Sequence, residues 1–206
     1  SLHDQLARAG FRRVENWVYR PACPSCNECK PWRVDAAAFV PSRNIARIWR
    51  NNSDLRSTMT PNRPTSEHYE LFQRYVISRH FDGQMAQMSE TDFVSMIENS
   101  PIETFLVDHF AADGRLIATV LADMQQDGLS AVYSFFDPDE SARSLGTYVI
   151  LDLLQRARES GLKWLYLGYF VEDSQKMKYK ARFQLAEIHT GGSWQPYVSN
   201  SDNDTS

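Results

Sequence analysis

The sequence predicts an α/β protein built on a mixed β-sheet. Three runs rich in β-branched and aromatic residues follow one another between residues 102 and 136, and the breaks between them end in Asp-Gly pairs, which favour tight hairpins. An amphipathic segment over 147–159 and an apolar run over 163–170 come next. A strand reached through a crossover helix usually runs parallel to the strand before that helix. We therefore expect an antiparallel meander that ends in one parallel strand.

Composition points to a globular protein with a sizeable core. The chain has 206 residues, of which 42% are hydrophobic. No apolar run approaches the roughly 20 residues that span a bilayer, and the first residues lack the apolar segment of a signal peptide. We therefore expect a cytoplasmic protein with no membrane partner. Three cysteines within seven residues also suit a reducing compartment better than a secreted disulfide framework.

Charge is distributed unevenly along the chain. Residues 12–63 hold ten Lys or Arg and four Asp or Glu, a net charge of +6, whereas residues 64–206 hold eleven and twenty-one, a net charge of −10. A basic segment of this kind indicates a surface for an anionic partner. A solvated basic helix would explain the charge alone equally well.

The first third of the chain reads as a small α/β region. We expect a helix over 2–9 ended by Gly10, strands over 14–19 and 32–34 around the cysteine loop, and a helix over 43–51 capped by Ser42. Residues 54–65 are polar, carry two prolines and are predicted to be a linker. The predicted division is therefore a basic, cysteine-containing region over 1–57, a larger domain over 66–192 and a flexible tail over 193–206.

The larger domain begins with two helices. Ser66 is predicted to cap the first, which extends to about residue 79, and Ser89 with Asp92 forms a capping-box pattern for the second, through residue 97. A loop over 79–88 separates them. Strands over 102–110, 115–124 and 129–136 follow, then a polar loop, the helix over 147–159 and the last strand.

This order of helices and strands is that of a GNAT-like, or acyl-CoA N-acyltransferase-like, domain. In such a domain two adjacent strands splay apart to admit an acyl donor, and the helix between them points its N-terminus at the opening. The junction here is YSFFDPDESARSLGT. Gly146 would allow close approach of the backbone, and the N–H groups beyond it could hold a developing oxyanion. An acetyl-CoA-dependent enzyme is disfavoured, because the stretch from Arg143 to Tyr148 lacks the second small residue of a pyrophosphate loop.

Several motifs together resemble one enzyme family. YSFFDPDESARSLGTYVILDLL and WLYLGYFVEDSQKMKYKARFQ, preceded by GFRRxxNxxYRPACxxCxxC and PSR, are similar to the aminoacyl-tRNA–protein transferases of the N-degron pathway. The likeness covers about residues 6–190 and is strongest to the bacterial aspartate/glutamate leucyltransferases, relatives of eukaryotic arginyltransferases. It implies transfer of leucine from Leu-tRNA to an N-terminal Asp or Glu, which marks the acceptor protein for degradation. Arginyl transfer from Arg-tRNA and a non-catalytic tRNA- or acidic-peptide-binding module are the alternatives.

The implied reaction needs positioning and oxyanion stabilisation more than a nucleophile, and no Ser-His-Asp arrangement is evident. We expect catalytic contacts from the SLG turn and a neighbouring strand: Ser144, Leu145, Gly146 and Tyr133. An acidic acceptor requires a cation, and alternation in an extended segment would place Lys178 and Lys180 on one side. The expected substrate-binding residues are Lys178, Tyr179, Lys180, Arg182, Tyr166, Tyr169 and Phe135. A solvated charge run and ordinary core aromatics are the alternatives.

Two further groups of residues have expected roles. The basic residues expected to contact tRNA phosphates are Arg12, Arg13, Arg33, Arg43, Arg47 and Arg50; no DNA partner is expected. Cys23, Cys26 and Cys29, spaced C-x2-C-x2-C, supply three of the four ligands of a closed tetrahedral metal site. The resemblance implies an iron–sulfur cluster, and a further N-terminal family segment with a Cys-Pro-Tyr-like motif as the source of the fourth ligand. Zinc, or a reduced structural or redox-sensing loop, are the alternatives, and transfer itself should need no cofactor.

Overall fold

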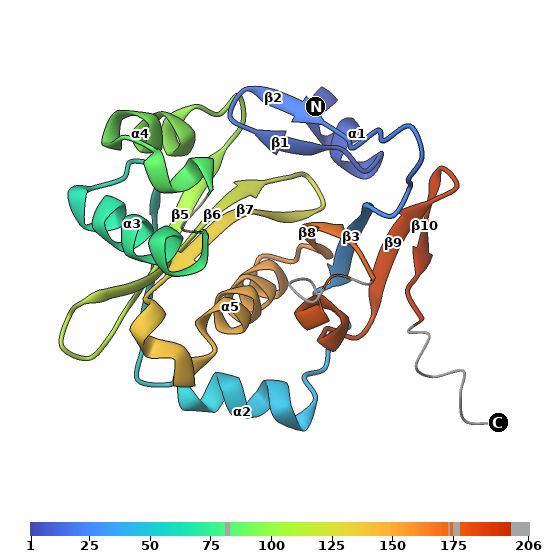
Figure 1. The fold of residues 1–206 in the computed structure, drawn as a ribbon. Coiled ribbons are helices and arrows are strands. Elements are labelled where there is room, and N and C mark those ends of the chain that lie inside the picture. Colours follow the sequence, from blue (N-terminus) through green and yellow to red (C-terminus); the bar gives the residue numbers. More distant parts are fainter. Residues whose placement is uncertain (81–82, 173, 175–177, 199–206) are drawn as a thin grey trace.

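A computed structural model describes residues 1–80, 83–172, 174 and 178–198. Its centre is an eight-stranded sheet in the order β10-β9-β3-β8-β7-β6-β5-β4, and a two-stranded hairpin lies beside it (Figure 1). No helix in the described ranges is long and apolar enough to cross a membrane.

The predicted meander and its parallel strand are confirmed. The antiparallel strands β5 (Thr104–Phe110), β6 (Leu116–Met124) and β7 (Gly128–Phe136) are neighbours in the sheet. Helix α5 (Leu145–Glu159), which begins two residues earlier than expected, leads to β8 (Trp164–Phe170), and β8 pairs with β7 in parallel. This arrangement confirms the GNAT-like fold class.

The N-terminal segment forms helix α1 (Leu2–Arg8) and then a hairpin, where the sequence led us to expect a single strand over 14–19. Strand β1 (Arg12–Val14) pairs with β2 (Trp17–Tyr19), and the turn between them places Glu15 at a φ of 48°. Two strands of three residues are too short to give a clear alternation, so their separation is hard to read from residue types.

Three other strand predictions were wrong. Strand β3 (Lys30–Asp35) does not return beside the hairpin but lies inside the main sheet, between β8 and β9 (Ala186–Thr190). The predicted linker contains the edge strand β4 (Arg56–Pro61), which pairs with β5. The predicted tail begins with β10 (Ser193–Pro196), paired with β9; its residues 199–206 lie outside the described residues.

Helices cover both faces of the sheet. Helices α2 (Arg43–Asn51) and α5 pack on one face, while α3 (Ser66–His80) and α4 (Glu90–Glu98) pack on the other. Both predicted caps are present: Ser42 accepts from the Ile45 N–H, and Ser89 forms a capping box with Asp92. The short helices η1 (Gln84–Gln87), η2 (Pro138–Arg143) and η3 (Lys178–Arg182) lie in segments expected to be loop or extended.

Candidate active site

Strands β7 and β8 separate soon after they meet. Their parallel ladder has three residue pairs, from Gly128 with Trp164 to Ser130 with Tyr166, and in the part of the chain that the structure describes no β-ladder joins them beyond that point. Gly128 allows the closest approach, because a Cβ there would overlap the backbone of Trp164. The remaining halves of the two strands thus present unpaired backbone groups to each other, which is the splay expected of the fold.

Arg12 from the hairpin fills the β7 side of the splay. Its Nη2 donates hydrogen bonds to the carbonyl oxygens of Ala131, at 2.8 Å, and Val132, at 3.4 Å. Its guanidinium lies directly against Gly168 of β8, where φ is +78° and any Cβ would overlap it. Burial lowers the pKa of Arg12 from its usual value. Arg12 therefore supports the splay and does not present its charge on an outer surface, contrary to its expected tRNA contact.

Lys180 fills the β8 side. Its Nζ donates to the carbonyl oxygens of Leu167, at 2.7 Å, and Tyr169, at 2.5 Å, and the residue is only 6% exposed. Burial, followed by the positive charge of Arg12, lowers the pKa of Lys180 to about 7. The KMKYKAR stretch forms the short helix η3, so the expected alternation of an extended segment was wrong. The side chain of Lys178 lies outside the described residues, and Arg182 is exposed.

Tyrosines surround these two cations. Tyr179 of η3, Tyr133 of β7 and Tyr75 of α3 are half-buried, and burial raises the pKa of each hydroxyl. The Tyr133 ring lies 6.1 Å from Phe72, measured between ring centroids. Neutral, half-buried phenols beside open backbone groups make this a mostly apolar site with a few polar atoms, as small-molecule sites usually are.

The other aromatic residues predicted for the site have structural roles. Phe135 is fully buried and packs on Phe72 and Phe93 beneath α3 and α4, so it cannot line the splay. Tyr166 is 5% exposed and donates to Asp127. The Tyr169 hydroxyl donates to the carbonyl oxygens of Gly10 and Tyr19, which holds the hairpin against β8. Burial raises the pKa of Tyr166 and of Tyr169 to about 12, so both are neutral donors.

The SLG turn opens helix α5 as expected, with one change of role. Ser144 is the N-cap in a left-handed conformation, at φ 54° and ψ 46°, and its side chain makes no capping hydrogen bond. Gly146 packs on the Phe136 ring, at 3.1 Å from an added Cβ, so a larger residue would displace β7. Leu145 is 1% exposed and belongs to the core, so only its backbone can contact a ligand.

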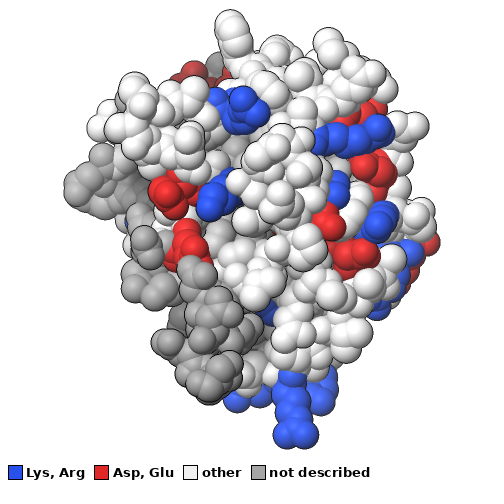
Figure 2. All heavy atoms as spheres, turned by 90° about the vertical axis from the view of Figure 1, so that its right-hand side faces the viewer, with Lys and Arg blue, Asp and Glu red and all other residues white. Residues whose placement is uncertain are grey.

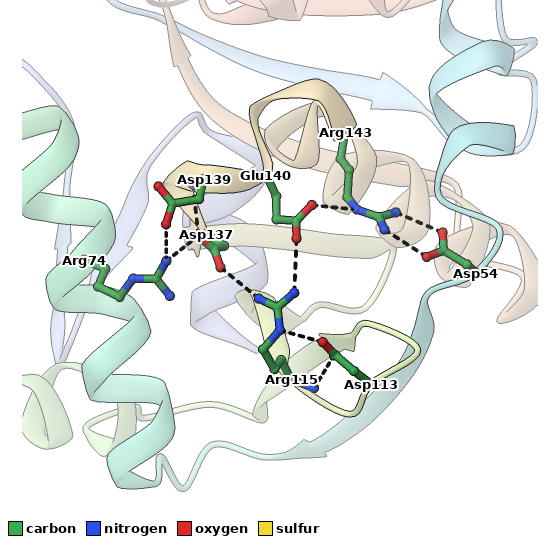
Figure 3. Close-up of polar contacts among 8 residues, drawn as sticks. All are labelled: Asp54, Arg74, Asp113, Arg115, Asp137, Asp139, Glu140 and Arg143. Carbon is green, nitrogen blue, oxygen red and sulfur yellow. Dashed lines mark hydrogen bonds and ion pairs between the residues drawn. The ribbon is translucent and has the colours of Figure 1, made fainter.

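An ion-pair network fixes the segment before that turn (Figure 3). Arg143 binds both carboxylate oxygens of Asp54 at 2.9 Å and contacts Glu140 at 3.0 Å. Arg115 contacts Glu140 as well, and Arg74 of α3 contacts Asp137 at 2.7 Å. Because its donors already face carboxylates, Arg143 is poorly placed to bind a pyrophosphate. This geometry strengthens the sequence argument against acetyl-CoA.

The expected tRNA-contacting arginines fall into two sets. Arg13 is 5% exposed and forms a bidentate ion pair with Asp123, at 2.6 and 2.8 Å; Arg33 pairs with Glu187 and stacks 3.6 Å from the Trp164 ring centroid. These two support the fold, so their predicted phosphate contacts do not agree with the structure.

The arginines of α2 form the second set, which we call the α2 face: Arg43, Arg47 and Arg50. All are exposed, and no carboxylate among the described residues pairs with them. Figure 2 shows Lys and Arg side chains projecting at the lower end of the molecule, the end at which Figure 1 places α2. Asn52 follows α2 directly and donates to the Arg143 carbonyl oxygen at 2.9 Å. The α2 face therefore lies next to the start of α5.

The three cysteines lie in the loop between β2 and β3. Cys23 and Cys26 face each other across an isolated β-bridge and are exposed, and Cys29 is partly buried. Within the described ranges, no three His, Cys, Asp or Glu side chains converge so as to hold a metal ion. The three thiols therefore do not fit a metal or cluster site as they are arranged, and no step below uses one.

Solved structures and family models agree on what this site belongs to. A GNAT-like sheet with a splayed strand pair defines a class of acyl-transferring domains. The chain covers 65% of a solved DUF2156 domain from Agrobacterium fabrum, with 92% of its own length, a TM-score of 0.57 and 14% identity; for L-PGS from Bacillus licheniformis the shares are 45% and 68%, with a TM-score of 0.53 and 11% identity. At such identities these likenesses show the fold alone.

Sequence relatives narrow the class further. The model of the arginine-tRNA-protein transferase N-terminus matches residues 1–47, and that of the C-terminus matches residues 67–190. The chain is 48% identical to a protein of Paramagnetospirillum magneticum named aspartate/glutamate leucyltransferase, over 96% of this chain and 81% of the relative. One of the same name from Gluconacetobacter diazotrophicus is 49% identical, over 95% and 75%. The chain belongs to the arginine-tRNA-protein transferase family and is an aminoacyltransferase.

Sequence reasoning missed two supports of the splay. Gly168 lies inside the LYLGY motif, and an isolated glycine between aromatic strand residues is a signal of close approach. That signal could have pointed to a partner packed on this position. Tyr75 carried no comparable signal, because its spacing in α3 is that of an ordinary core residue.

Proposed function

We propose that this enzyme transfers leucine from Leu-tRNA to the N-terminal Asp or Glu of acceptor proteins in the cytoplasm and so marks them for degradation. The observation that carries the proposal is the 48–49% identity, over nearly the whole chain, to proteins named for this activity. The splay between β7 and β8 supports it, because an acyl-transfer site of this shape can hold an aminoacyl ester beside an amine.

The chemistry asked of the site is aminolysis of an ester. The acceptor's α-amine attacks the leucyl carbonyl carbon, and the ribose oxygen of the tRNA leaves. The ester is already activated, so much of the rate can come from orientation and from donors aimed at the developing oxyanion. The backbone N–H groups that open α5 after Ser144, beside Gly146, are the donors that we assign to this role.

The acceptor's acidic side chain needs a cation that is not already used. Arg182 of η3 is exposed and lies two residues from Lys180, whose own Nζ is engaged by β8. We assign the carboxylate contact to Arg182, with the half-buried Tyr179 as part of the pocket wall. Lys178 remains a prediction for the same role.

The tRNA is proposed to approach along the α2 face, next to the start of α5. Its three exposed arginines offer sites for phosphate groups, and counterion release would make binding depend steeply on salt.

A donor-and-acceptor assay tests the proposal. [14C]Leu-tRNA and [14C]Arg-tRNA are offered separately to peptides that begin with Asp, Glu, Arg or Lys. We expect label from Leu-tRNA on the Asp and Glu peptides alone. Label from Arg-tRNA on the same peptides would support the arginyl alternative, and tRNA binding without any labelled peptide would support a binding module.

A further inference from the structure

We propose that Lys180 takes the proton from the acceptor's α-ammonium group, which turns that group into the nucleophile. The inference rests on the proposed function and assigns a step of that reaction to a residue that the sequence alone had suggested for carboxylate binding. It starts from where Nζ lies: between the splayed strands, on the β8 edge, with Arg12 on the opposite edge.

The hydrogen bonds of Lys180 suit a neutral amine. A neutral Nζ has two N–H bonds and one lone pair. The carbonyl oxygens of Leu167 and Tyr169 accept two hydrogen bonds from it, at 2.7 and 2.5 Å. With both N–H groups used, the lone pair is left over to accept a proton. Carboxylate binding would require the ammonium form, and no described carboxylate pairs with Lys180.

The surroundings of Lys180 also favour the neutral form. Nζ is buried, and the nearby guanidinium of Arg12 adds a positive charge that disfavours a second one. The titratable groups around the splay are otherwise phenols, Tyr169 on β8 and Tyr179 on η3, and both remain neutral near pH 7 because burial raises the pKa of each. A base that titrates near the operating pH is the most effective proton acceptor.

The proposed step balances without any further reactant. One proton passes from the α-ammonium to Lys180 Nζ, and the freed lone pair forms the N–C bond to the leucyl carbonyl carbon. The bond from that carbon to the ribose oxygen then breaks with its electron pair. Lys180 gives its proton to the departing ribose oxygen, and the second proton of the attacking nitrogen passes to water, which leaves a neutral amide and regenerates the neutral lysine.

The test is single-turnover transfer from [14C]Leu-tRNA to an Asp-initiated peptide, followed from pH 5.5 to 9.5, in the wild-type protein and in Lys180→Arg. Arginine keeps N–H donors for the two carbonyls but cannot act as a base in this range. We expect at least about a 100-fold loss at pH 7. The loss should shrink toward pH 9, because the peptide's own α-amine, with a pKa of about 8, then needs no base.

Controls separate this role from a structural one. Lys163→Arg makes the same change at a lysine that packs on Trp164 outside the splay, and should leave the profile unchanged. The melting temperature and Leu-tRNA affinity of each variant report on folding and donor binding; if Lys180→Arg fails to fold, Lys180→Met takes its place. In the wild-type profile, transfer should rise with an apparent pKa below that of the peptide amine.

Three results would count against the proposal. They are a Lys180→Arg protein with wild-type rates at every pH, a loss of the same size at pH 7 and pH 9, and a wild-type profile that follows the peptide amine alone. A wild-type protein that labels no peptide would overturn the proposed function itself, and the inference with it.

Discussion

Arg12 and Gly168 show how two distant motifs depend on each other. Arg12 belongs to GFRR near the N-terminus and Gly168 to LYLGY, yet the guanidinium lies directly on the glycine. Only a residue without a Cβ can both adopt a φ of +78° and leave room for Arg12. The glycine is therefore required twice, once by its backbone conformation and once by its neighbour.

Gly168→Ala should disturb the splay without destroying the fold. The added methyl group must push the Arg12 side chain away and must accept a left-handed backbone, so we expect a loss of about 1–3 kcal/mol in the free energy of unfolding. Transfer should fall more than stability suggests, because Arg12 would leave the Ala131 carbonyl. Urea unfolding and initial transfer rates measure the two effects; Gly114→Ala, also at positive φ but in open space, is the matched control.

The residues of the site could be predicted only in part. Residue chemistry placed Ser144 and Gly146 at the start of α5, because a helix N-terminus after a strand has a local signature. It assigned Arg13 to tRNA, whereas Arg13 pairs with Asp123, 110 residues away. A buried ion pair and an exposed phosphate contact need the same arginine, and only the partner, brought close by folding, distinguishes them.

At the scale of elements, periodicity and turn chemistry predicted the meander and α5 well. The Asp-Gly breaks and the apolar stripe of α5 are local signals, and the structure follows them. The position of β3 could not be read in the same way, since its hydrogen-bond partners come from residues 164–170 and 186–190. Strand β9 was missed because its sequence, AEIHT, is short and half polar.

The α2 face makes a testable element. Replacing Arg47 by Glu should weaken Leu-tRNA binding and reduce the steepness of its salt dependence, because fewer counterions are released. Each lost phosphate contact should lower the slope of log K against log salt by about 1. Arg56→Glu, a similar reversal on edge strand β4, is the control; equal effects from both variants would argue against a specific role for α2.

At the scale of the whole molecule, a buried polar cluster ties the sheet to its covering helix. His109 of β5 lies 3.1 Å from Asp152 of α5, and Arg156 and Ser57 contact the same carboxylate. Burial alone would raise the pKa of Asp152, but the contacts with His109 and Arg156 outweigh it and lower the pKa to about 2. The ionised carboxylate therefore stabilises the folded state.

This pKa shift fixes how stability depends on pH. A carboxyl whose pKa is depressed on folding stabilises the protein above its ordinary value near 4, and that contribution is lost as the pH falls through about 2. Asp152→Asn should thus cost about 2 kcal/mol of unfolding free energy at pH 7. The deficit should narrow steadily in urea titrations between pH 4 and pH 2. A deficit that is constant over this range would mean that packing, not charge, explains it.

The place of β3 in the sheet has a consequence for how the enzyme is made. Its ladder partners on β8 lie about 130 residues further along the chain, and at ~5–20 residues per second a ribosome needs roughly ten seconds to reach them. Until then β3 has no neighbours, and neither Arg12 nor Lys180 has two strands to hold apart. A nascent chain therefore gains its site only when synthesis is nearly complete, so no partial product can take leucine from the tRNA pool of the translating cell.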